Sequence, residues 1–147
     1  MRFVNVMRYG SLSCAVCFAI WINSAAIAQD NADNEVGPFQ LAQLLVEAGT
    51  VLQGEITIDP ANGDMGSFIP ITVMHGNQEG PVLSLIAGIH GSEYSPILSM
   101  QKLPSLLDPS EMSGTLIIVH IANMPAFTGR TVYFGPIDLK NLNRSFP

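Results

Sequence analysis

Apolar and polar positions recur with two different periods along the chain, and these periods separate predicted strands from predicted helices. Segments 51–58 and 68–74 are rich in β-branched and aromatic residues, and the turn-forming run 59–64 lies between them, which predicts a β-hairpin. The run 82–89 is almost wholly apolar, which is typical of a central strand covered on both faces. The β-branched run 115–121 predicts another central strand.

Two stretches have helical character. Between residues 38 and 48 the apolar positions follow a mostly helical spacing, and Gly49 provides a stop signal, so we expect a short amphipathic helix there. Further along, Ser95 as N-cap and Pro96 at the first helical position predict a helix that ends near residue 103, ahead of a proline.

The order of these segments predicts the fold class. A strand, a helix and a strand between residues 82 and 121 form a right-handed parallel βαβ unit. With the preceding hairpin, this unit indicates an α/β fold with a mixed, mostly parallel sheet and flanking helices. Residues 106–114, 122–130 and 136–147 have no regular period and are expected to be loops.

The first 28 residues have the features of a secretory signal peptide. Arg2 and Arg8 form a basic start, residues 11–22 are largely apolar but too few to span a membrane, and Ala26-Ile27-Ala28 is a small-x-small cleavage site. We expect cleavage after Ala28, the bacterial periplasm as the compartment, and no stable membrane association afterwards. An uncleaved anchor is the alternative.

Composition limits the possible partners. The sequence is 48% hydrophobic, which argues for a folded core. Signal cleavage removes two of the six basic residues and none of the twelve acidic ones, which leaves a net charge of −8. Nucleic acid is therefore excluded as a partner, because no basic patch can neutralise phosphates. Cys14 and Cys17 leave with the signal, so their C-x-x-C spacing creates no redox or zinc site in the mature chain.

Candidate chemistry gathers where the apolar run 82–89 ends. His90 directly follows this run, with Gly88 two residues before it and Gly91 directly after it. Glu93 comes three residues after His90, just before the predicted helix. Side chains at the carboxyl end of a strand in an open α/β sheet project into a crevice, so these two can point at one spot. An imidazole and a carboxylate there could hold a zinc ion. In the alternative interpretation, Glu93 is only a favourable anion in the first turn of the helix.

The other histidines and the loop arginines are weaker candidates. His75 is expected to be solvated in a turn, and His120 to be a satisfied residue within a strand. Arg130 and Arg144 are either plain surface charges or a clamp for a carboxylate. Three asparagines near them in the sequence could assist such a clamp: Asn123, Asn141 and Asn143.

Three motifs occur in order and at suitable spacings: GIHGSEY at 88–94, ANMPAF at 122–127 and DLKNLNRSFP at 138–147. Together they resemble the succinylglutamate desuccinylase/aspartoacylase family, the amidohydrolase branch of the zinc carboxypeptidase-like fold. The resemblance covers roughly residues 55–147. It implies a zinc-dependent deacylase that hydrolyses the amide bond, in preference to an ester bond, of an N-acylated amino acid or a related small carboxylate.

The resemblance also implies a role for each matching residue. His90 and Glu93 would be two ligands of one Zn²⁺ ion. Arg130 would polarise the scissile carbonyl and stabilise its oxyanion. Asn143 and Arg144 would bind the substrate carboxylate.

One departure from the family pattern concerns the length of the chain. In relatives the third zinc ligand, a histidine, and the glutamate general base lie further along than Pro147. We therefore expect residues 29–49 to be a leader and short helix, residues 50–147 to be the N-terminal part of a truncated catalytic domain, and the 147-residue chain to be inactive alone. The alternatives are a carboxypeptidase-type zinc peptidase and a non-catalytic secreted fragment.

Overall fold

The computed structural model describes residues 35–146. The predicted signal peptide at 1–28 and residues 29–34 of the predicted leader lie outside this range. Within residues 35–146, none of the helices is long and apolar enough to cross a membrane.

A four-stranded mixed sheet forms the centre of the described part. Its strands are β3 (Thr50–Ile58), β4 (Ser67–His75), β5 (Gln78–Ile86) and β6 (Ser113–Val119), in the spatial order β3-β4-β6-β5. β3 pairs antiparallel with β4, as the predicted hairpin requires, and β4 pairs antiparallel with β6. β5 and β6 are parallel. The predicted mixed sheet is confirmed, and its parallel part within residues 35–146 is the β5–β6 pair.

The predicted βαβ crossover is also present, with a helix that starts earlier than expected. Helix α1 (Tyr94–Lys102) joins β5 to β6, and the 3-10 turn η1 (Leu103–Leu106) extends it. Glu93, not Ser95, occupies the N-cap position, so the predicted cap is wrong. The reason is that the carbonyl of Glu93 already accepts from the Ile97 N–H, at 3.3 Å, which places Ser95 inside the first turn.

The prediction that 82–89 forms a central, doubly covered strand is wrong in position. β5 is an edge strand of this sheet, and the residues Val82 and Leu83 are 55% and 56% exposed. The crossover places β6 between β4 and β5, so β6 is a central strand, as the sequence correctly predicted at 115–121. A short apolar run does not by itself distinguish a covered strand from one at an edge.

The helix predicted between residues 38 and 48 is also wrong, because this segment is a small hairpin. Strand β1 (Phe39–Leu41) pairs antiparallel with β2 (Leu44–Val46), and Ala42 in the connecting turn has a left-handed φ of 49°. Phe39, Leu41 and Leu44 contact the same core cluster as Val46. Two alternating strands around a two-residue turn therefore produced an apolar spacing that resembles a helix.

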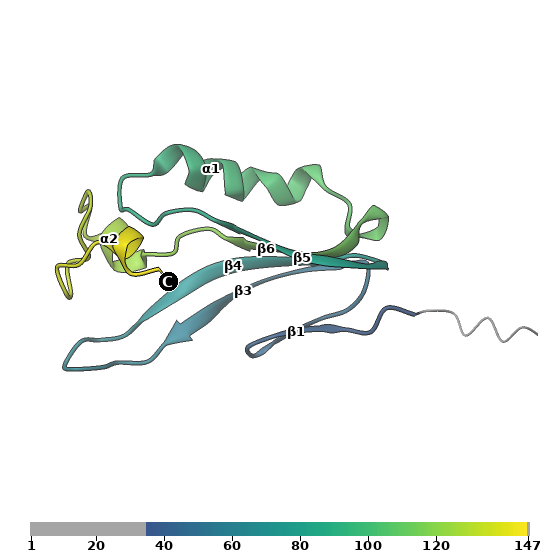
Figure 1. Ribbon diagram of the computed structural model, residues 1–147, viewed down its shortest axis with the longest axis horizontal. Helices are drawn as coiled ribbons and strands as arrows, with labels where there is room; N and C mark the ends of the chain where they lie inside the picture. Colours follow the sequence, from purple (N-terminus) through teal and green to yellow (C-terminus); the bar gives the residue numbers. More distant parts are fainter. Residues whose placement is uncertain (1–34, 147) are drawn as a thin grey trace, which may run out of the picture. The chain divides into compact units, whose positions relative to one another are not determined.

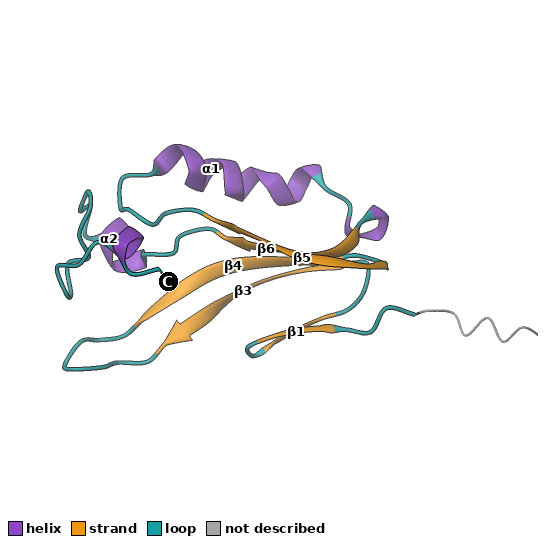
Figure 2. Cartoon of the chain, in the orientation of Figure 1, coloured by secondary structure: helices purple, strands orange, loops and turns teal. Residues whose placement is uncertain are grey.

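The described part has three layers. Figure 1 shows α1 along one face of the sheet and the β1–β2 hairpin along the other, and Figure 2 separates the purple helix layer from the orange strands. Successive residues of β4 point to opposite faces of the sheet. Ile71 and Val73 are buried against the hairpin. Met74 is buried on the other face, in a cluster with residues of β6 that also contacts α1 and η1. The sheet is thereby fixed between two apolar layers.

Short helical turns interrupt segments predicted as loops. η2 (Pro109–Glu111) lies in 106–114, α2 (Met124–Thr128) lies in 122–130, and η3 (Leu142–Arg144) lies near the end of the chain. Each follows an Asp or Asn whose side chain accepts a backbone N–H at the N-cap, and this local capping is what distinguishes these turns from the predicted loops.

Candidate metal and substrate site

The segments that follow β5 and β6 lie side by side. Backbone hydrogen bonds continue beyond the strands: the N–H groups of Ala122 and Asn123 donate to the carbonyls of Ala87 and Gly88, each at 2.9 Å. Gly88 has a φ of 65°, which glycine adopts at no steric cost. This turn at the carboxyl end of β5 carries His90.

His90 and Glu93 point at each other. The Nδ1 atom of His90 lies 2.7 Å from Oε1 of Glu93, and their side chains are 16% and 34% exposed. The second carboxylate oxygen of Glu93 accepts the backbone N–H of Ile89 at 3.0 Å, which fixes the orientation of the carboxylate. One nitrogen and one oxygen of the types that zinc prefers are thus brought together on a constrained turn. Residues 35–146 contain no group of three or more His, Cys, Asp and Glu side chains positioned to share a metal.

Two further residues hold the imidazole from its other sides. Nε2 of His90 lies 3.0 Å from Oδ1 of Asn141, which comes from the C-terminal motif. The ring of Tyr133 meets that of His90 edge-to-face, with 5.4 Å between centroids and 84° between planes. Neither contact follows from local sequence: the sequence predicts Asn141 only as a helper of a carboxylate clamp, and no local signal points to Tyr133.

Asn143 and Arg144 lie on the turn that Asn141 caps. Both belong to η3, and both are exposed to solvent. The guanidinium of Arg144 donates from Nη1 to the carbonyl of Asn143 at 3.4 Å. The structure therefore places the predicted substrate-binding pair directly beside the residue that contacts His90.

Arg130 follows α2 in an unusual backbone conformation. Its φ is 54°, in the left-handed region that most non-glycine residues avoid. Its exposed side chain lines an open cavity of about 450 Å³ together with Tyr94, Phe127 and Thr128. Tyr94 directly follows Glu93, and its ring packs edge-on against Phe127 with centroids 6.1 Å apart. Arg130 thus lies beside the residue next to Glu93.

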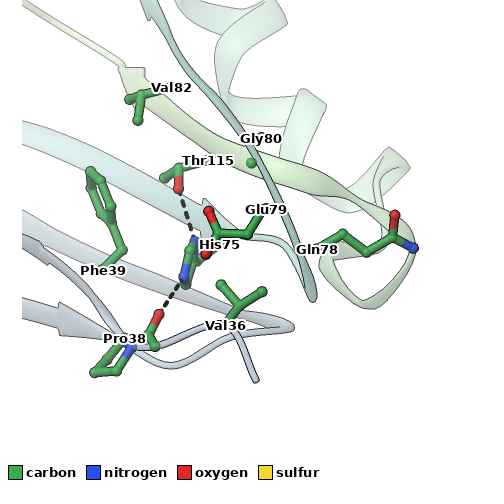
Figure 3. Close-up of a pocket in the computed structure, with 11 residues that line it drawn as sticks. Val36, Pro38, Phe39, His75, Gln78, Glu79, Gly80, Val82 and Thr115 are labelled. Atoms are coloured by element: carbon green, nitrogen blue, oxygen red, sulfur yellow. Dashed lines mark hydrogen bonds between the residues drawn. The ribbon is translucent and has the colours of Figure 1, made fainter. Parts of the chain in front are cut away.

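The expectation that His75 is solvated is wrong. His75 ends β4 and is 6% exposed, with Nδ1 at 2.8 Å from the Thr115 hydroxyl and Nε2 at 2.9 Å from the Gly37 carbonyl. Figure 3 shows these bonds beside a cavity of about 240 Å³ that Phe39 also lines. The β1–β2 hairpin, which the sequence did not predict, covers this histidine. His75 pairs with Thr115, near the start of β6 and at the end of the sheet away from His90.

His120 is only partly satisfied. It directly follows β6, and its Nε2 lies 2.7 Å from the Thr72 hydroxyl, but its buried Nδ1 has no hydrogen-bond partner within the part of the chain that the structure describes. Burial lowers the pKa of His120 below its ordinary value because it disfavours the charged imidazolium.

Comparison with known proteins assigns these elements to one family. Residues 79–147 match the succinylglutamate desuccinylase/aspartoacylase catalytic domain. The chain is 41% identical over 105 residues to the N-alpha-acetyl-L-2,4-diaminobutyric acid deacetylase of Halomonas elongata; the match covers 69% of this chain and 30% of that relative. The chain thus spans about 30% of the length of the curated relative that it matches.

Solved structures give the same result. The product-bound ectoine utilization protein EutE of Ruegeria pomeroyi superposes with a TM-score of 0.60 at 32% identity, over 76% of this chain and 34% of that one. An aspartoacylase family protein of Mesorhizobium loti superposes with a TM-score of 0.62 at 30% identity, over the same shares. Over residues 79–147 the chain therefore shares the sequence of the succinylglutamate desuccinylase/aspartoacylase catalytic domain, and the chain shares part of the fold of this family.

Proposed function

We propose that the protein is a zinc-dependent deacylase that hydrolyses the amide bond of a small N-acylated amino acid. The convergence of His90 Nδ1 and Glu93 Oε1 at 2.7 Å carries this proposal, because it occurs inside the segment that matches the family. The deacetylase relative supports an acylated amino acid as the substrate class.

The residues present fit a zinc ion. A histidine nitrogen and a carboxylate oxygen are common zinc ligands, and Glu93 is already oriented by the Ile89 N–H. His90 and Glu93 would supply two of its ligands. When bound, zinc lowers the pKa of a water molecule and polarises a carbonyl group.

In this proposal Arg130, Arg144 and Asn143 are the residues that contact the substrate. Arg130 would donate N–H groups to the oxyanion that develops on the scissile carbonyl, an interaction that is stronger in the transition state than in the ground state. Arg144 and Asn143 would bind the carboxylate of the amino acid, since a guanidinium matches a carboxylate with two parallel hydrogen bonds. Their solvent exposure leaves them free to meet a ligand.

The backbone of Arg130 supports a role for its side chain. A left-handed φ costs a non-glycine residue on the order of 1–2 kcal/mol, and glycine would avoid this cost. Strained residues concentrate at functional sites, where the side chain is needed in spite of the strain.

Zinc binding gives the first test. The purified chain is titrated with Zn²⁺ against a chromophoric chelator, in parallel with His90→Ala. The proposal expects zinc binding that depends on His90. Equal binding by both proteins, with unchanged stability of the variant, would instead favour a non-catalytic role for this turn.

Activity is best tested in a complete relative. The matching segment of the Halomonas deacetylase is replaced by the 105 residues of this chain, and folding of the chimera is confirmed by circular dichroism. We expect zinc-dependent release of acetate from N-alpha-acetyl-L-2,4-diaminobutyric acid, and loss of this activity with His90→Ala. Preferential cleavage of peptides by the chimera would support the carboxypeptidase-type alternative. A folded, zinc-loaded chimera without any hydrolase activity would refute the proposal.

We place the protein in the bacterial periplasm, on the basis of the sequence of residues 1–28. Expression of the full chain in a Gram-negative host should give a mature N-terminus at Gln29 in periplasmic extracts, measured by intact mass. Ala26→Lys should block this processing, because the cleavage site needs small residues. A cytoplasmic, unprocessed wild-type chain would overturn the placement.

A further inference from the structure

Asn141 connects two parts of the site through one oxygen atom. Its Oδ1 lies 3.0 Å from His90 Nε2 and also accepts the backbone N–H of Asn143 at 3.0 Å. His90 is 51 positions before Asn141 in the sequence, whereas Asn143 is two positions after it.

The second contact defines which end of the amide faces the histidine. If the Asn141 amide were flipped, its NH₂ group would meet the Asn143 N–H, and two donors would oppose each other. The oxygen of the amide, not its nitrogen, must therefore face the Asn143 N–H and His90 Nε2. An oxygen acceptor at Nε2 requires that Nε2 carries a proton, because an unprotonated nitrogen could not donate to it.

We propose that Asn141 is a positioning residue that holds the proton of His90 on Nε2 and thereby leaves Nδ1 for a metal ion. This inference rests on the proposed zinc site and adds a residue to it. A histidine that binds a metal through one ring nitrogen commonly donates its other N–H to a protein oxygen, which fixes the ring orientation. Here Nδ1 is the nitrogen that faces Glu93, and at 2.7 Å it shares a proton with the carboxylate oxygen. A metal ion bound at Nδ1 would displace this proton, whereas the proton on Nε2 would stay on Asn141, so the ring orientation that Asn141 imposes is the one that the His90–Glu93 pair requires.

The same oxygen couples the metal ligand to the turn that carries the substrate-binding candidates. Asn141 caps η3, which contains Asn143 and Arg144. A rotation of the His90 ring removes one of the two hydrogen bonds at Oδ1, and a change in η3 removes the other. Coupling between two such sites is reciprocal, so zinc loading should also make the Asn143 amide less accessible to exchange.

The test uses three variants of the full chain. Asn141→Ala removes the acceptor, and Asn141→Asp keeps an oxygen at the same place. Asp138→Ala is the matched control: Asp138 makes the same kind of turn in the same loop, with Oδ1 accepting the Lys140 N–H at 3.0 Å, and no hydrogen bond joins it to His90.

Two readouts apart from activity decide the outcome. Zinc affinity, from chelator competition, should fall by about 10- to 100-fold in Asn141→Ala and stay within a few-fold of wild type in the other two variants. In the metal-free protein, the nuclear Overhauser effect between the His90 and Tyr133 rings should weaken in Asn141→Ala alone.

The possible results separate this inference from the proposed function. If wild type binds zinc through His90 but Asn141→Ala resembles Asp138→Ala in both readouts, Asn141 is not a positioning residue and the zinc site stands. If neither wild type nor the chimera with the Halomonas relative binds zinc, the proposed function fails, and the ring contact in the metal-free protein still decides whether Asn141 orients His90. Equal loss in Asn141→Ala and Asp138→Ala would indicate general disruption of the loop and would overturn the inference.

Discussion

The backbone carbonyl of Thr131 packs directly against the Cα of Gly91, next to the candidate zinc ligand His90. A Cβ at position 91 would overlap both this oxygen and the carbonyl oxygen of Ala126. The turn that carries His90 and the end of α2 are therefore in backbone contact, and Gly91 is the residue that permits it.

Gly91→Ala should separate these two segments. We expect destabilisation of about 1–3 kcal/mol, because backbone atoms rather than a flexible side chain must move. Urea unfolding followed by circular dichroism measures the change. Gly37→Ala is the control: nothing lies within 4 Å of a Cβ there, so its stability should match wild type. Equal stability of both variants would contradict the close packing at Gly91.

Glu93→Gln should reduce zinc affinity by more than about 100-fold. The amide keeps the shape of the side chain and can still accept from the Ile89 N–H, but it lacks the negative charge of a zinc ligand. Loss of a ligand should exceed the roughly 10- to 100-fold effect of residues that only orient ligands. Chelator competition gives the affinity, with the exposed Glu111→Gln as control. If Glu93 serves only the start of α1, stability should fall while zinc binding stays at the control value.

Arg130→Gly should separate stability from function. Glycine relieves a left-handed cost of about 1–2 kcal/mol but increases the entropy of the unfolded chain by about 0.4–1 kcal/mol, so stability should remain equal or rise slightly. Leu139→Gly, at the same φ of 54°, is the matched stability control. In the chimera with the Halomonas relative, Arg130→Gly should lower kcat/KM by about 10²–10³-fold, the usual effect of removing an oxyanion donor. An unchanged kcat/KM would remove Arg130 from the proposed site.

His120 should make stability depend on pH below about 7. Burial lowers its pKa in the folded state below 6.5. As the pH falls below 6.5, the unfolded chain therefore takes up a proton that the folded chain does not, and the free energy of unfolding decreases. The decrease ends once the pH is below the folded pKa.

Urea unfolding across this range should show a smaller decrease for His120→Gln than for wild type. Asp108→Asn is a control for the pH range in which stability changes. Hydrogen bonds from Ser110 lower the pKa of Asp108 below 3.8, so its contribution is lost only in more acidic solution. An identical pH profile for His120→Gln and wild type would show that His120 does not titrate differently on folding.

The sequence determined the elements whose signals are local. The turn-rich run 59–64 produced the β3–β4 hairpin, and an apolar run, a proline near a helix start and a β-branched run produced the βαβ unit. The position of His90 and Glu93 at this strand-to-helix turn indicated that their side chains could point at one spot, and the 2.7 Å contact between them agrees with this. The three family motifs were also readable without a structure.

Tertiary structure decided which strand is central, what the segment 38–48 becomes and what surrounds the site. β5 and β6 are both apolar runs, and only the crossover placed β6 in the middle. The hairpin β1–β2 forms because its apolar residues pack on β4, and it buries His75 in doing so. Asn141 and Tyr133 reach His90 from 51 and 43 positions away, and the loop that carries them has no periodic pattern. Local patterns record the burial preferences of neighbouring residues, whereas contacts between distant loops depend on the path of the whole chain.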